Sequence, residues 1–317
     1  MSLAERLLRC LGDGRPRSTP TLCQQLQTSP ALLAAAREQL IKLGVSFQHA
    51  EADKLQLTAP IDWLDPARLQ ACATALDLDL AIVDICPSTN AALTEDLAER
   101  PLPCVLLAEG QSGGRGRRGR GWASPPGAGI YLSLGWRFQC PVAELTALGL
   151  IASMAAAKAL NACQRSLVQV KWPNDLQVAG RKLGGCLVDL TGPTDGPCEV
   201  IIGLGINVNL PSTALIDQPW TDLRSAGFSQ TRTELAIALL ESLVNNLRVL
   251  EANGSAALLS DWHELNALAN QPLSVHWDDG RQVLGKAAGI DNNGHLRLRT
   301  GSGEISLHSG EVRVRPT

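Results

Sequence analysis

The segment that most constrains the fold of this 317-residue chain is residues 111–134, QSGGRGRRGRGWASPPGAGIYLSL. Within it, residues 113–121 consist of four arginines and five glycines, and residues 130–136 then alternate as a strand does. Glycine lets consecutive amides turn toward an anion, and arginine presents a planar set of donors that suits carboxylates and phosphates. We therefore expect an ordered anion-binding loop that enters a strand. A solvated basic loop or a nucleic-acid patch is the alternative, but glycines interrupt the arginines and a strand follows at once.

The overall composition is that of an ordinary, slightly acidic globular protein. The chain is 45% hydrophobic and 19% charged with a net charge of −3, and its length predicts two or three domains. An acidic body disfavours nonspecific nucleic-acid binding and indicates that the basic loop takes a small anion. Nine scattered cysteines without a C-x-x-C pair, and no recognisable signal peptide, predict a cytoplasmic protein with reduced thiols and no membrane span.

Residues 1–60 have the plan of a winged helix-turn-helix domain. Ser29 is a good helix N-cap, Pro30 suits the first helical position, and Gly44 suits the residue just past a helix end. The expected elements are helices at 4–11, 21–27 and 30–43, followed by a hairpin of strands 45–47 and 54–58.

The chemistry of this domain argues against DNA binding. A recognition helix needs polar or basic side chains near its N-terminus, whereas this one carries Ala34-Ala35-Ala36. The domain has seven Lys/Arg against five Asp/Glu, a small excess of positive charge for neutralising DNA phosphates. The hairpin tip at residues 48–53 is acidic. The sequence therefore favours a structural role for this domain over operator binding.

Residues 61–79 form a connector, and residues 80–268 are predicted to form the main α+β domain. Its first strand leads into the polar turn Ser88-Thr89-Asn90, and its second strand leads into the glycine–arginine loop. Both turns lie at strand ends, where pockets form, although the polar turn alone is an ordinary helix N-cap. The expected elements are helices at 66–75, 89–100, 142–163, 231–252 and 256–266, strands at 80–85, 104–108, 130–136 and 200–209, and a further strand after Lys182.

Two more polar clusters follow the helix predicted at residues 142–163. In VQVKWPNDL, Lys171 and Asp175 flank a rigid proline turn, although such a pair is commonly a surface ion pair of little consequence. In RKLGGCLVDL, Lys182 stands beside two glycines, so its amine can approach a carboxylate or phosphoryl oxygen. A lone lysine at a turn is usually a solvated cation, and the arginine loop upstream is what favours the functional interpretation.

Residues 269–317 change to short alternating strands with tight turns at Asp279-Gly280 and Asn293-Gly294. The expected strands are 273–277, 282–288, 295–299, 304–308 and 312–315. We expect a small β-barrel of SH3-like type, without chemistry of its own.

These motifs, taken together, resemble one family. GRGRRGRGW, KWPNDL, RKLGGCLVDL and IGLGIN occur in an order and spacing similar to those of the bifunctional biotin–protein ligases and biotin-operon repressors of bacteria. The resemblance covers the whole chain, strongly at residues 80–210 and weakly at 1–60. It implies an α+β fold with a winged helix-turn-helix-like domain, a central mixed sheet like that of class II synthetases, and a C-terminal SH3-like barrel.

The resemblance also implies a two-step reaction. The biotin carboxylate attacks the α-phosphorus of ATP, with Mg²⁺, to give biotinyl-5′-AMP and pyrophosphate. The biotinyl group then passes to a lysine of the biotin carboxyl carrier protein of acetyl-CoA carboxylase. The Ala-rich recognition helix and the acidic hairpin tip depart from the repressors of the family, which places repression and operator binding in question while leaving the ligase activity untouched.

The resemblance assigns site residues by position. Lys182 and Arg117 are the candidate catalytic residues, and no metal ligand is assigned. The biotin-binding positions are Ser88, Thr89, Asn90, Gln111, Arg115, Gly116, Arg117 and Lys182. The nucleotide-binding positions are Arg117, Arg120, Trp122, Lys171, Asn174, Asp175 and Asn207.

Other functions stay open at the level of the sequence. A lipoate– or octanoate–protein ligase could share the fold, a biotin-sensing transcription factor could use the ligase fold as its sensor, and a nonspecific nucleic-acid binder could use the arginine loop. The sequence also leaves open whether two copies pair through the edges of their central sheets to form a homodimer.

Overall fold

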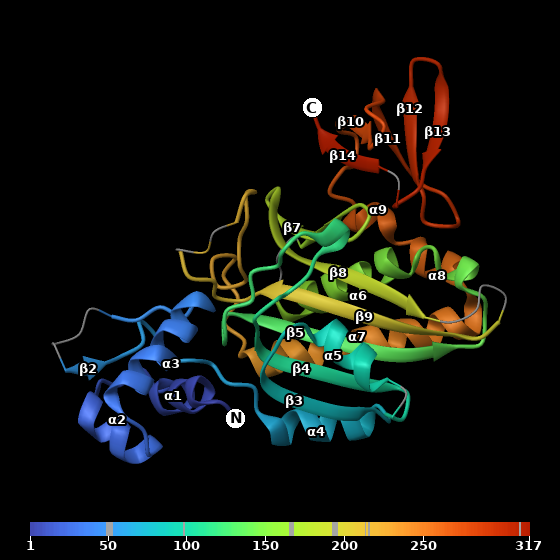
Figure 1. Ribbon diagram of the computed structural model, residues 1–317. Coiled ribbons are helices and arrows are strands. Elements are labelled where there is room, and N and C mark those ends of the chain that lie inside the picture. The colour runs from blue at the N-terminus through green and yellow to red at the C-terminus, as the bar shows by residue number, and fades with distance from the viewer. Residues whose placement is uncertain are drawn as a thin grey trace.

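The computed structural model describes residues 1–48, 53–97, 99–164, 168–191, 196–212, 214, 216–310 and 312–317. The chain forms a group of helices at the N-terminal end, a large central sheet with helices, and a small sheet at the C-terminal end (Figure 1). This arrangement confirms the α+β class that the sequence predicts.

Seven strands form the central sheet, in the order β3-β4-β5-β9-β8-β7-β6. β3 and β4 run parallel because α5 (Thr89–Asp96) crosses between them, and every later pair is antiparallel. The strands are β3 (Asp79–Cys86), β4 (Cys104–Gln111), β5 (Gly129–Phe138), β6 (Gln169–Lys171), β7 (Asp175–Val178), β8 (Arg181–Thr191) and β9 (Cys198–Asn207).

Helices cover the two faces of this sheet unequally. α6 (Leu148–Cys163) and α7 (Arg232–Asn253) lie behind the sheet in Figure 1, and with α4 (Pro66–Ala75) they enclose the main core. On the opposite face α5 covers a smaller core that includes Leu93 and Ile201. Of the α-helices in the described part of the chain, only α5 packs on this face, and the candidate site lies beyond it.

The apolar segment predicted as one helix at residues 142–163 is divided. A 3-10 turn, Val142–Leu145, precedes α6, and the hydroxyl of Thr146 at the break donates to the carbonyl of Asn293 in the C-terminal sheet. The predicted helix is confirmed in extent, but its first turn is a 3-10 helix and the α-helix begins at Leu148. Among the described residues this segment has the length and composition to cross a membrane, but 67% of its most apolar window is buried in the fold, as in a core helix.

Two other predicted helices are shorter than expected. α5 ends at Asp96 instead of Arg100, where the chain turns back toward β4. The helix expected at 256–266 is split into α8 (Ser255–Leu259) and α9 (Trp262–Leu265). Between them, Asp261 forms an ion pair with Lys158 of α6 at 2.6 Å.

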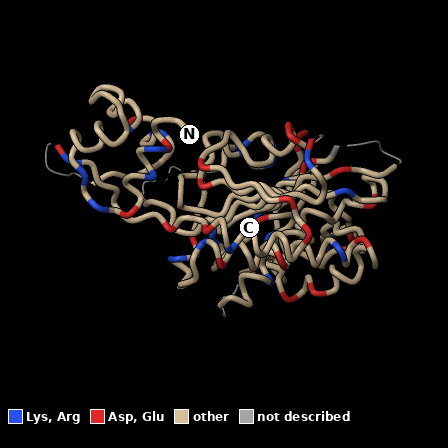
Figure 2. The backbone as a smooth tube through the Cα atoms, turned by 90° about the horizontal axis from the view of Figure 1, so that it is seen from below, with Lys and Arg blue, Asp and Glu red and all other residues tan. Residues whose placement is uncertain are grey.

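The N-terminal group consists of α1 (Leu3–Leu11), α2 (Thr19–Leu26) and α3 (Pro30–Lys42) around a leucine-rich core. Ser29 caps α3 as predicted, and Gly44 follows it with a φ of +85°. Phe47 and Leu57 form an antiparallel bridge, which confirms the expected hairpin, while residues 49–52 lie outside the described part of the chain. The tube in Figure 2 shows acidic and basic residues mixed along this group.

The second strand of that hairpin also pairs with a segment that lies outside the hairpin. β2 (Lys54–Leu55) pairs with β1 (Arg17–Ser18), a strand that the sequence patterns did not predict. The N-terminal group is tied to the central sheet through Arg9 of α1, which forms an ion pair with Asp84 of β3 and lies 3.9 Å from the ring centroid of Trp63.

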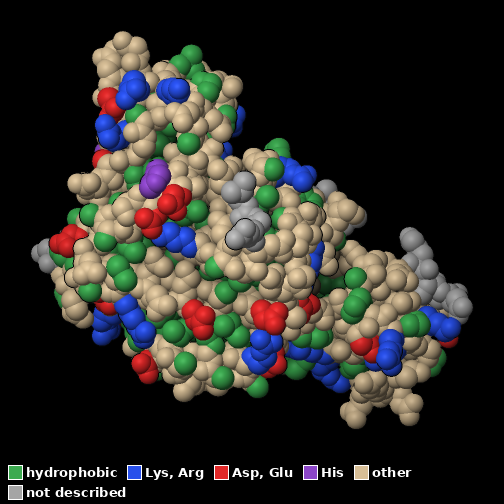
Figure 3. Space-filling model, turned by 180° about the vertical axis from the view of Figure 1, so that it is seen from behind, with side chains coloured by type: hydrophobic (Ala, Val, Ile, Leu, Met, Phe, Trp, Pro, Cys, Tyr) green, Lys and Arg blue, Asp and Glu red, His purple; other side chains and the backbone are tan. Residues whose placement is uncertain are grey.

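Five strands form the C-terminal sheet, in the order β13-β12-β11-β10-β14, and all five predicted strands are confirmed. Seen from behind in Figure 3, this part projects from the main body and carries charged side chains of both signs. The strands are β10 (Pro272–Trp277), β11 (Gln282–Ile290), β12 (Leu296–Thr300), β13 (Gly303–Leu307) and β14 (Val312–Pro316).

An ion pair in the interior joins the elements that carry the site. Arg232, at the start of α7, is 0% exposed, and its Nη1 lies 2.5 Å from Oε2 of Glu109 in β4. Its Nε also donates to the carbonyl of Gly129 in β5 at 2.9 Å, and its Nη1 donates to the carbonyl of Asp62 in the connector at 2.8 Å. Glu109 Oε1 in turn accepts from the backbone amide of Leu64 at 3.0 Å.

We expect Arg232→Met to lower the free energy of unfolding by about 3–5 kcal/mol, because it leaves the Glu109 carboxylate buried without its partner. Adding Glu109→Leu in the same chain should recover part of this loss. Urea unfolding would measure both, with Arg137→Met as the control, since the exposed pair Arg137–Glu199 should contribute less than about 1 kcal/mol. If Arg137→Met and Arg232→Met lowered the free energy of unfolding equally, the buried pair would not be the stabilising contact that we infer.

Candidate active site

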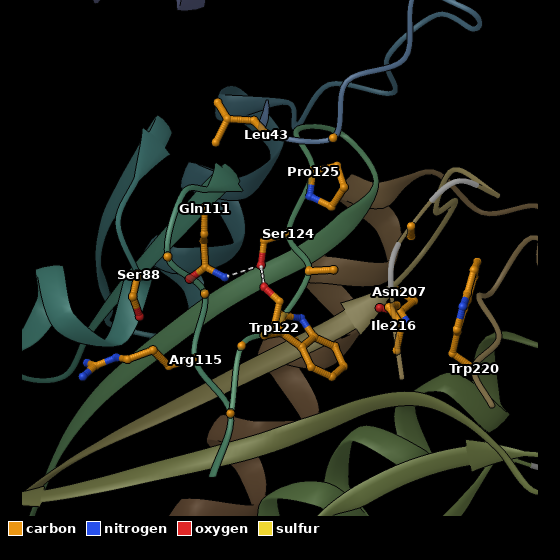
Figure 4. A pocket seen from close by; sticks show the side chains of 18 of the residues that line it. Leu43, Ser88, Gln111, Arg115, Trp122, Ser124, Pro125, Asn207, Ile216 and Trp220 are labelled. Carbon is orange, nitrogen blue, oxygen red and sulfur yellow. Dashed lines mark hydrogen bonds between the residues drawn. The ribbon is translucent and has the colours of Figure 1, made fainter. Parts of the chain in front are cut away.

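A cavity of about 1340 Å³ opens on the uncovered face of the central sheet. Figure 4 shows Ser88, Gln111 and Arg115 toward one side of it and Asn207 and Trp220 toward the other. Lys171 does not line the cavity and lies beside it on β6. The sequence-predicted site residues that line it are Ser88, Thr89, Asn90, Gln111, Arg115, Gly116, Arg117, Arg120, Trp122, Asn174, Asp175, Lys182 and Asn207.

Glycines of β8 and β9 form the floor of the cavity. Gly203, Gly205 and Gly185 point to the same face, because alternate residues of a strand share a face and Gly205 pairs with Gly185. A Cβ on Gly203 would lie 2.1 Å from Oδ1 of Asn90, and a Cβ on Gly205 would lie 2.6 Å from Nε1 of Trp122. The absence of side chains at these positions lets Asn90 and Trp122 lie flat on the sheet.

The polar turn and the first residues of the loop form one hydrogen-bonded wall. The amide of Thr89 donates to Oε1 of Gln111 at 2.8 Å, and Nε2 of Gln111 donates to Oγ of Ser124 at 2.8 Å. Ser88, which precedes α5, makes no capping bond with its side chain although it is 5% exposed. Its hydroxyl is therefore available to a ligand at this end of the cavity.

The glycine–arginine loop is ordered, as the sequence predicts. The amide of Trp122 donates to the carbonyl of Gly114 at 2.8 Å, and the amide of Gly116 donates to the carbonyl of Arg120 at 2.7 Å, so the loop closes on itself. A Cβ on Gly114 would lie 2.6 Å from both Oγ of Ser124 and the carbonyl oxygen of Trp122. Glycine is thus required at Gly114 by close approach.

The C-terminal sheet holds the tip of this loop. Arg118 donates to Oδ1 of Asp278 at 3.1 Å and to the carbonyl of Gly310 at 3.0 Å. Arg117 donates to the carbonyl of Ser309 and to Oδ1 of Asn174 at 3.2 Å. The sequence patterns predicted no chemistry for the C-terminal domain, and they gave no sign that its turns supply acceptors for two arginines of the loop.

Cationic side chains gather at the other end of the cavity. Nζ of Lys182 lies 2.7 Å from Oδ1 of Asp175 and 5.4 Å from the ring centroid of Trp122. Lys171 of β6 is the register partner of Asp175 of β7. Burial lowers the pKa of Lys171, and nearby positive charges, among them Lys182 and Arg315, lower it further. Burial and the neighbouring arginines likewise lower the pKa of Arg117. Several cations share one carboxylate here, so a bound anion would relieve their repulsion.

Comparison with known proteins places the chain among enzymes. The sequence profile of the biotin/lipoate A/B protein ligase family matches residues 83–207, and that of the biotin protein ligase C-terminal domain matches residues 277–315. A bifunctional ligase/repressor BirA of Salmonella typhimurium is 34% identical over 96% of this chain and 97% of its own. The chain belongs to the biotin protein ligase family. A biotin–[acetyl-CoA-carboxylase] ligase of Mycobacterium tuberculosis is 33% identical over 66% of this chain and 77% of its own.

Solved structures of biotin protein ligases show the same fold. The Aquifex aeolicus enzyme in complex with biotin and ATP superimposes with a TM-score of 0.63, at 23% identity over 75% of this chain and 99% of the Aquifex chain. The family membership agrees with the motif-based interpretation of the glycine–arginine loop.

Three polar residues at the biotin protein ligase site escaped the sequence analysis. Ser124 accepts from Gln111, while Ser133 of β5 and Asp189 of β8 both contact Asn90. The signal for Ser133 was present, because it is the one serine in the buried run IYLSLGW and is 0% exposed. No local signal marks Asp189, since its partner is 99 residues away in the sequence.

We expect Gly205→Ala to reduce biotin-dependent ATP–pyrophosphate exchange by about tenfold or more, because the new Cβ would displace the indole of Trp122 from the floor. Gly301→Ala is the matched control, since nothing lies within 4 Å of a Cβ at that position. Thermal unfolding of both variants would show whether the loss comes from the site. Normal exchange by Gly205→Ala would mean that the position of Trp122 does not matter.

Proposed function

We propose that this biotin protein ligase activates biotin with ATP and transfers it to a lysine of a biotin carboxyl carrier protein. The observation that carries the proposal is that one cavity has a hydrogen-bonding end, at Ser88, Thr89 and Gln111 with Arg115 on the same side, and a second end where Lys182 and Arg117 gather. The first end suits a ring with hydrogen-bonding groups, and the second suits a carboxylate beside a triphosphate.

In the first step, an oxygen of the biotin carboxylate bonds to the α-phosphorus of ATP, and pyrophosphate leaves with the electrons of the broken P–O bond. Both reactants are anions, so fixed cations must offset their repulsion and the charge that develops at phosphorus. We assign this role to Lys182 and Arg117, and we assign the nucleotide to the region of Arg120, Trp122 and Asn207. Lys182 would exchange its contact with Asp175 for one with the substrate oxygens.

In the second step, the ε-amine of the acceptor lysine attacks the acyl carbon of biotinyl-AMP, the amine loses a proton, and AMP leaves. The mixed anhydride must be shielded from water until the carrier protein arrives. The glycine–arginine loop borders the cavity and can cover it, with Arg115 and Gly116 on the loop itself.

The residues of this site fit a Mg²⁺ ion that binds together with the nucleotide phosphates. Among the described residues no cluster of three or more His, Cys, Asp or Glu could hold a metal by itself. Mg²⁺ commonly binds through substrate phosphates and one or two carboxylates, and Asp175 is the carboxylate beside Lys182. The ion would neutralise phosphate charge when bound, with Asp175 and Asn174 as the protein groups within reach.

The N-terminal group supports a second function. The relatives that match nearly the whole chain are named bifunctional ligase/repressor, and α2, α3 and the Phe47–Leu57 bridge follow one another in the order that a winged helix-turn-helix requires. We therefore propose biotin-dependent DNA binding as an additional activity, against the sequence-based expectation. The expected boundaries, 1–60, 61–79, 80–268 and 269–317 with an SH3-like last domain, remain predictions.

We expect the wild-type chain to catalyse ATP–pyrophosphate exchange with biotin and not with lipoate or octanoate, because its polar end offers partners to ring N–H and C=O groups. Lys182→Ala should lower the exchange rate by at least about 100-fold while leaving the unfolding temperature nearly unchanged. Exchange with the lipoyl acids would overturn the substrate assignment, and near-normal exchange by Lys182→Ala would overturn its role.

Mobility-shift titrations on fragments of the source genome, with and without biotin and ATP, would test the second function. We expect sequence-dependent binding that strengthens with the ligands. Gln39→Ala on the exposed face of α3 should weaken this binding without changing the exchange rate. Binding that ignores sequence and falls steeply with salt would indicate a nonspecific electrostatic interaction and contradict a repressor role.

A further inference from the structure

The loop tip, residues 115–121 of the glycine–arginine loop, is a small unit that is closed on itself. Arg115 and Gly121 form an antiparallel bridge, and the amide of Gly116 donates to the carbonyl of Arg120 at 2.7 Å. Arg118 lies at the turn between these two sides. Because internal bonds hold the loop tip together, it can move toward the cavity or away from it as one body.

Backbone packing against the rest of the protein does little to hold the loop tip. A Cβ on Gly119 or Gly121 would have no heavy atom within 4 Å, and a Cβ on Gly116 would meet only Arg120 of the same loop, at 3.6 Å. Arg118 has a φ of +58°, a left-handed conformation that is unfavourable for a residue with a side chain. The position of the loop tip beside the cavity therefore depends on contacts of its side chains.

Arg118 is bound to the C-terminal sheet by an ion pair and a hydrogen bond. Its Nη1 donates to Oδ1 of Asp278 at 3.1 Å, and its Nη2 donates to the carbonyl of Gly310 at 3.0 Å. Among the residues that the structure describes, Asp278 is the only carboxylate that forms an ion pair with an arginine of the loop. The side chain of Asp278 is 64% exposed, so the pair is weak enough to break and form again.

A second arginine shares the same carboxylate oxygen. Nη2 of Arg313, on β14, lies 3.3 Å from Oδ1 of Asp278. The two guanidinium groups repel each other while both contact this oxygen, and Asp278 keeps Arg313 as a partner when Arg118 leaves. Arg313 therefore lowers the free-energy cost of opening the loop, whereas Asp278 raises it.

We propose that Asp278 and Arg313 are positioning residues that act through Arg118, Asp278 by holding the loop over the cavity and Arg313 by competing for Asp278 and so favouring release of the loop. The proposal rests on the proposed function and deepens it, because it names the contacts that regulate how long biotinyl-AMP stays enclosed. A closed loop keeps the mixed anhydride from water and from lysines other than the acceptor. A weak contact suits this task, since the loop must open in every turnover to admit the carrier protein.

The test measures how fast the full-length protein, loaded with radiolabelled biotin and ATP, releases labelled biotinyl-AMP into an excess of unlabelled biotinyl-AMP. Asp278→Asn should raise the release rate by about two- to fivefold, the size expected for the loss of one exposed ion pair. Arg313→Met should lower the release rate by a similar factor, because Asp278 then has Arg118 as its remaining arginine partner. The two substitutions thus act in opposite directions.

A charge-conserving variant and a matched control distinguish this role from a general loss of structure. Asp278→Glu keeps the carboxylate, so its release rate should be closer to that of the wild type. Arg297→Met removes another exposed ion pair of the same sheet, with Glu304, and should leave the rate unchanged. Added salt should speed release from the wild type more than from Asp278→Asn, since screening weakens the ion pair. ATP–pyrophosphate exchange should stay near the wild-type rate in all variants, because Asp278 and Arg313 do not line the cavity.

The outcomes distinguish this inference from the proposed function. If the wild-type protein forms no biotinyl-AMP, the proposed function fails. If it forms biotinyl-AMP but Asp278→Asn and Arg313→Met release it at the wild-type rate, the role of the two residues is wrong while the ligase assignment stands. Release rates that change in the same direction in both variants, or an exchange rate that falls in both, would show a merely structural role and would also overturn the inference.

Discussion

The buried pair of Arg232 and Glu109 is the interaction on which the rest of the structure depends. Burying two charges is costly unless each has several partners, and here the guanidinium and the carboxylate are bound from β5 and from the connector as well as by each other. Glu109 lies two residues before Gln111, where the polar wall of the site begins. The same contacts that connect α7 to the sheet therefore fix the start of the glycine–arginine loop.

The site lies where glycines leave one face of the central sheet without side chains. Gly185, Gly203 and Gly205 make a floor on which Asn90 and Trp122 lie, while the opposite face of the same strands is covered by α6 and α7. A flat floor allows one cavity to hold a hydrogen-bonding end and a lysine-containing end side by side. The reaction that we propose needs this proximity, because a ring that must be recognised and a carboxylate that must be activated belong to the same substrate.

Much of this was predictable because it depends on neighbours in the sequence. The cap at Ser29, the C-terminal strands and the ordered glycine–arginine loop follow from local geometry and alternation, and all are confirmed. What the sequence did not predict lies where distant segments meet. The break before α6 coincides with a bond from Thr146 to Asn293, and the C-terminal sheet holds Arg118, 192 residues from its partner Gly310.

The sequence by itself determined the family, the class of chemistry and many of the polar residues that line the cavity, because motifs carry their own spacing and side-chain types. The tertiary structure decided how those residues are oriented. The side chain of Asn90, for example, is held by Ser133 and Asp189, which lie 43 and 99 positions away from it in the sequence. A hydrogen bond has a direction set by all of its partners, and the partners are known only when the strands are in register.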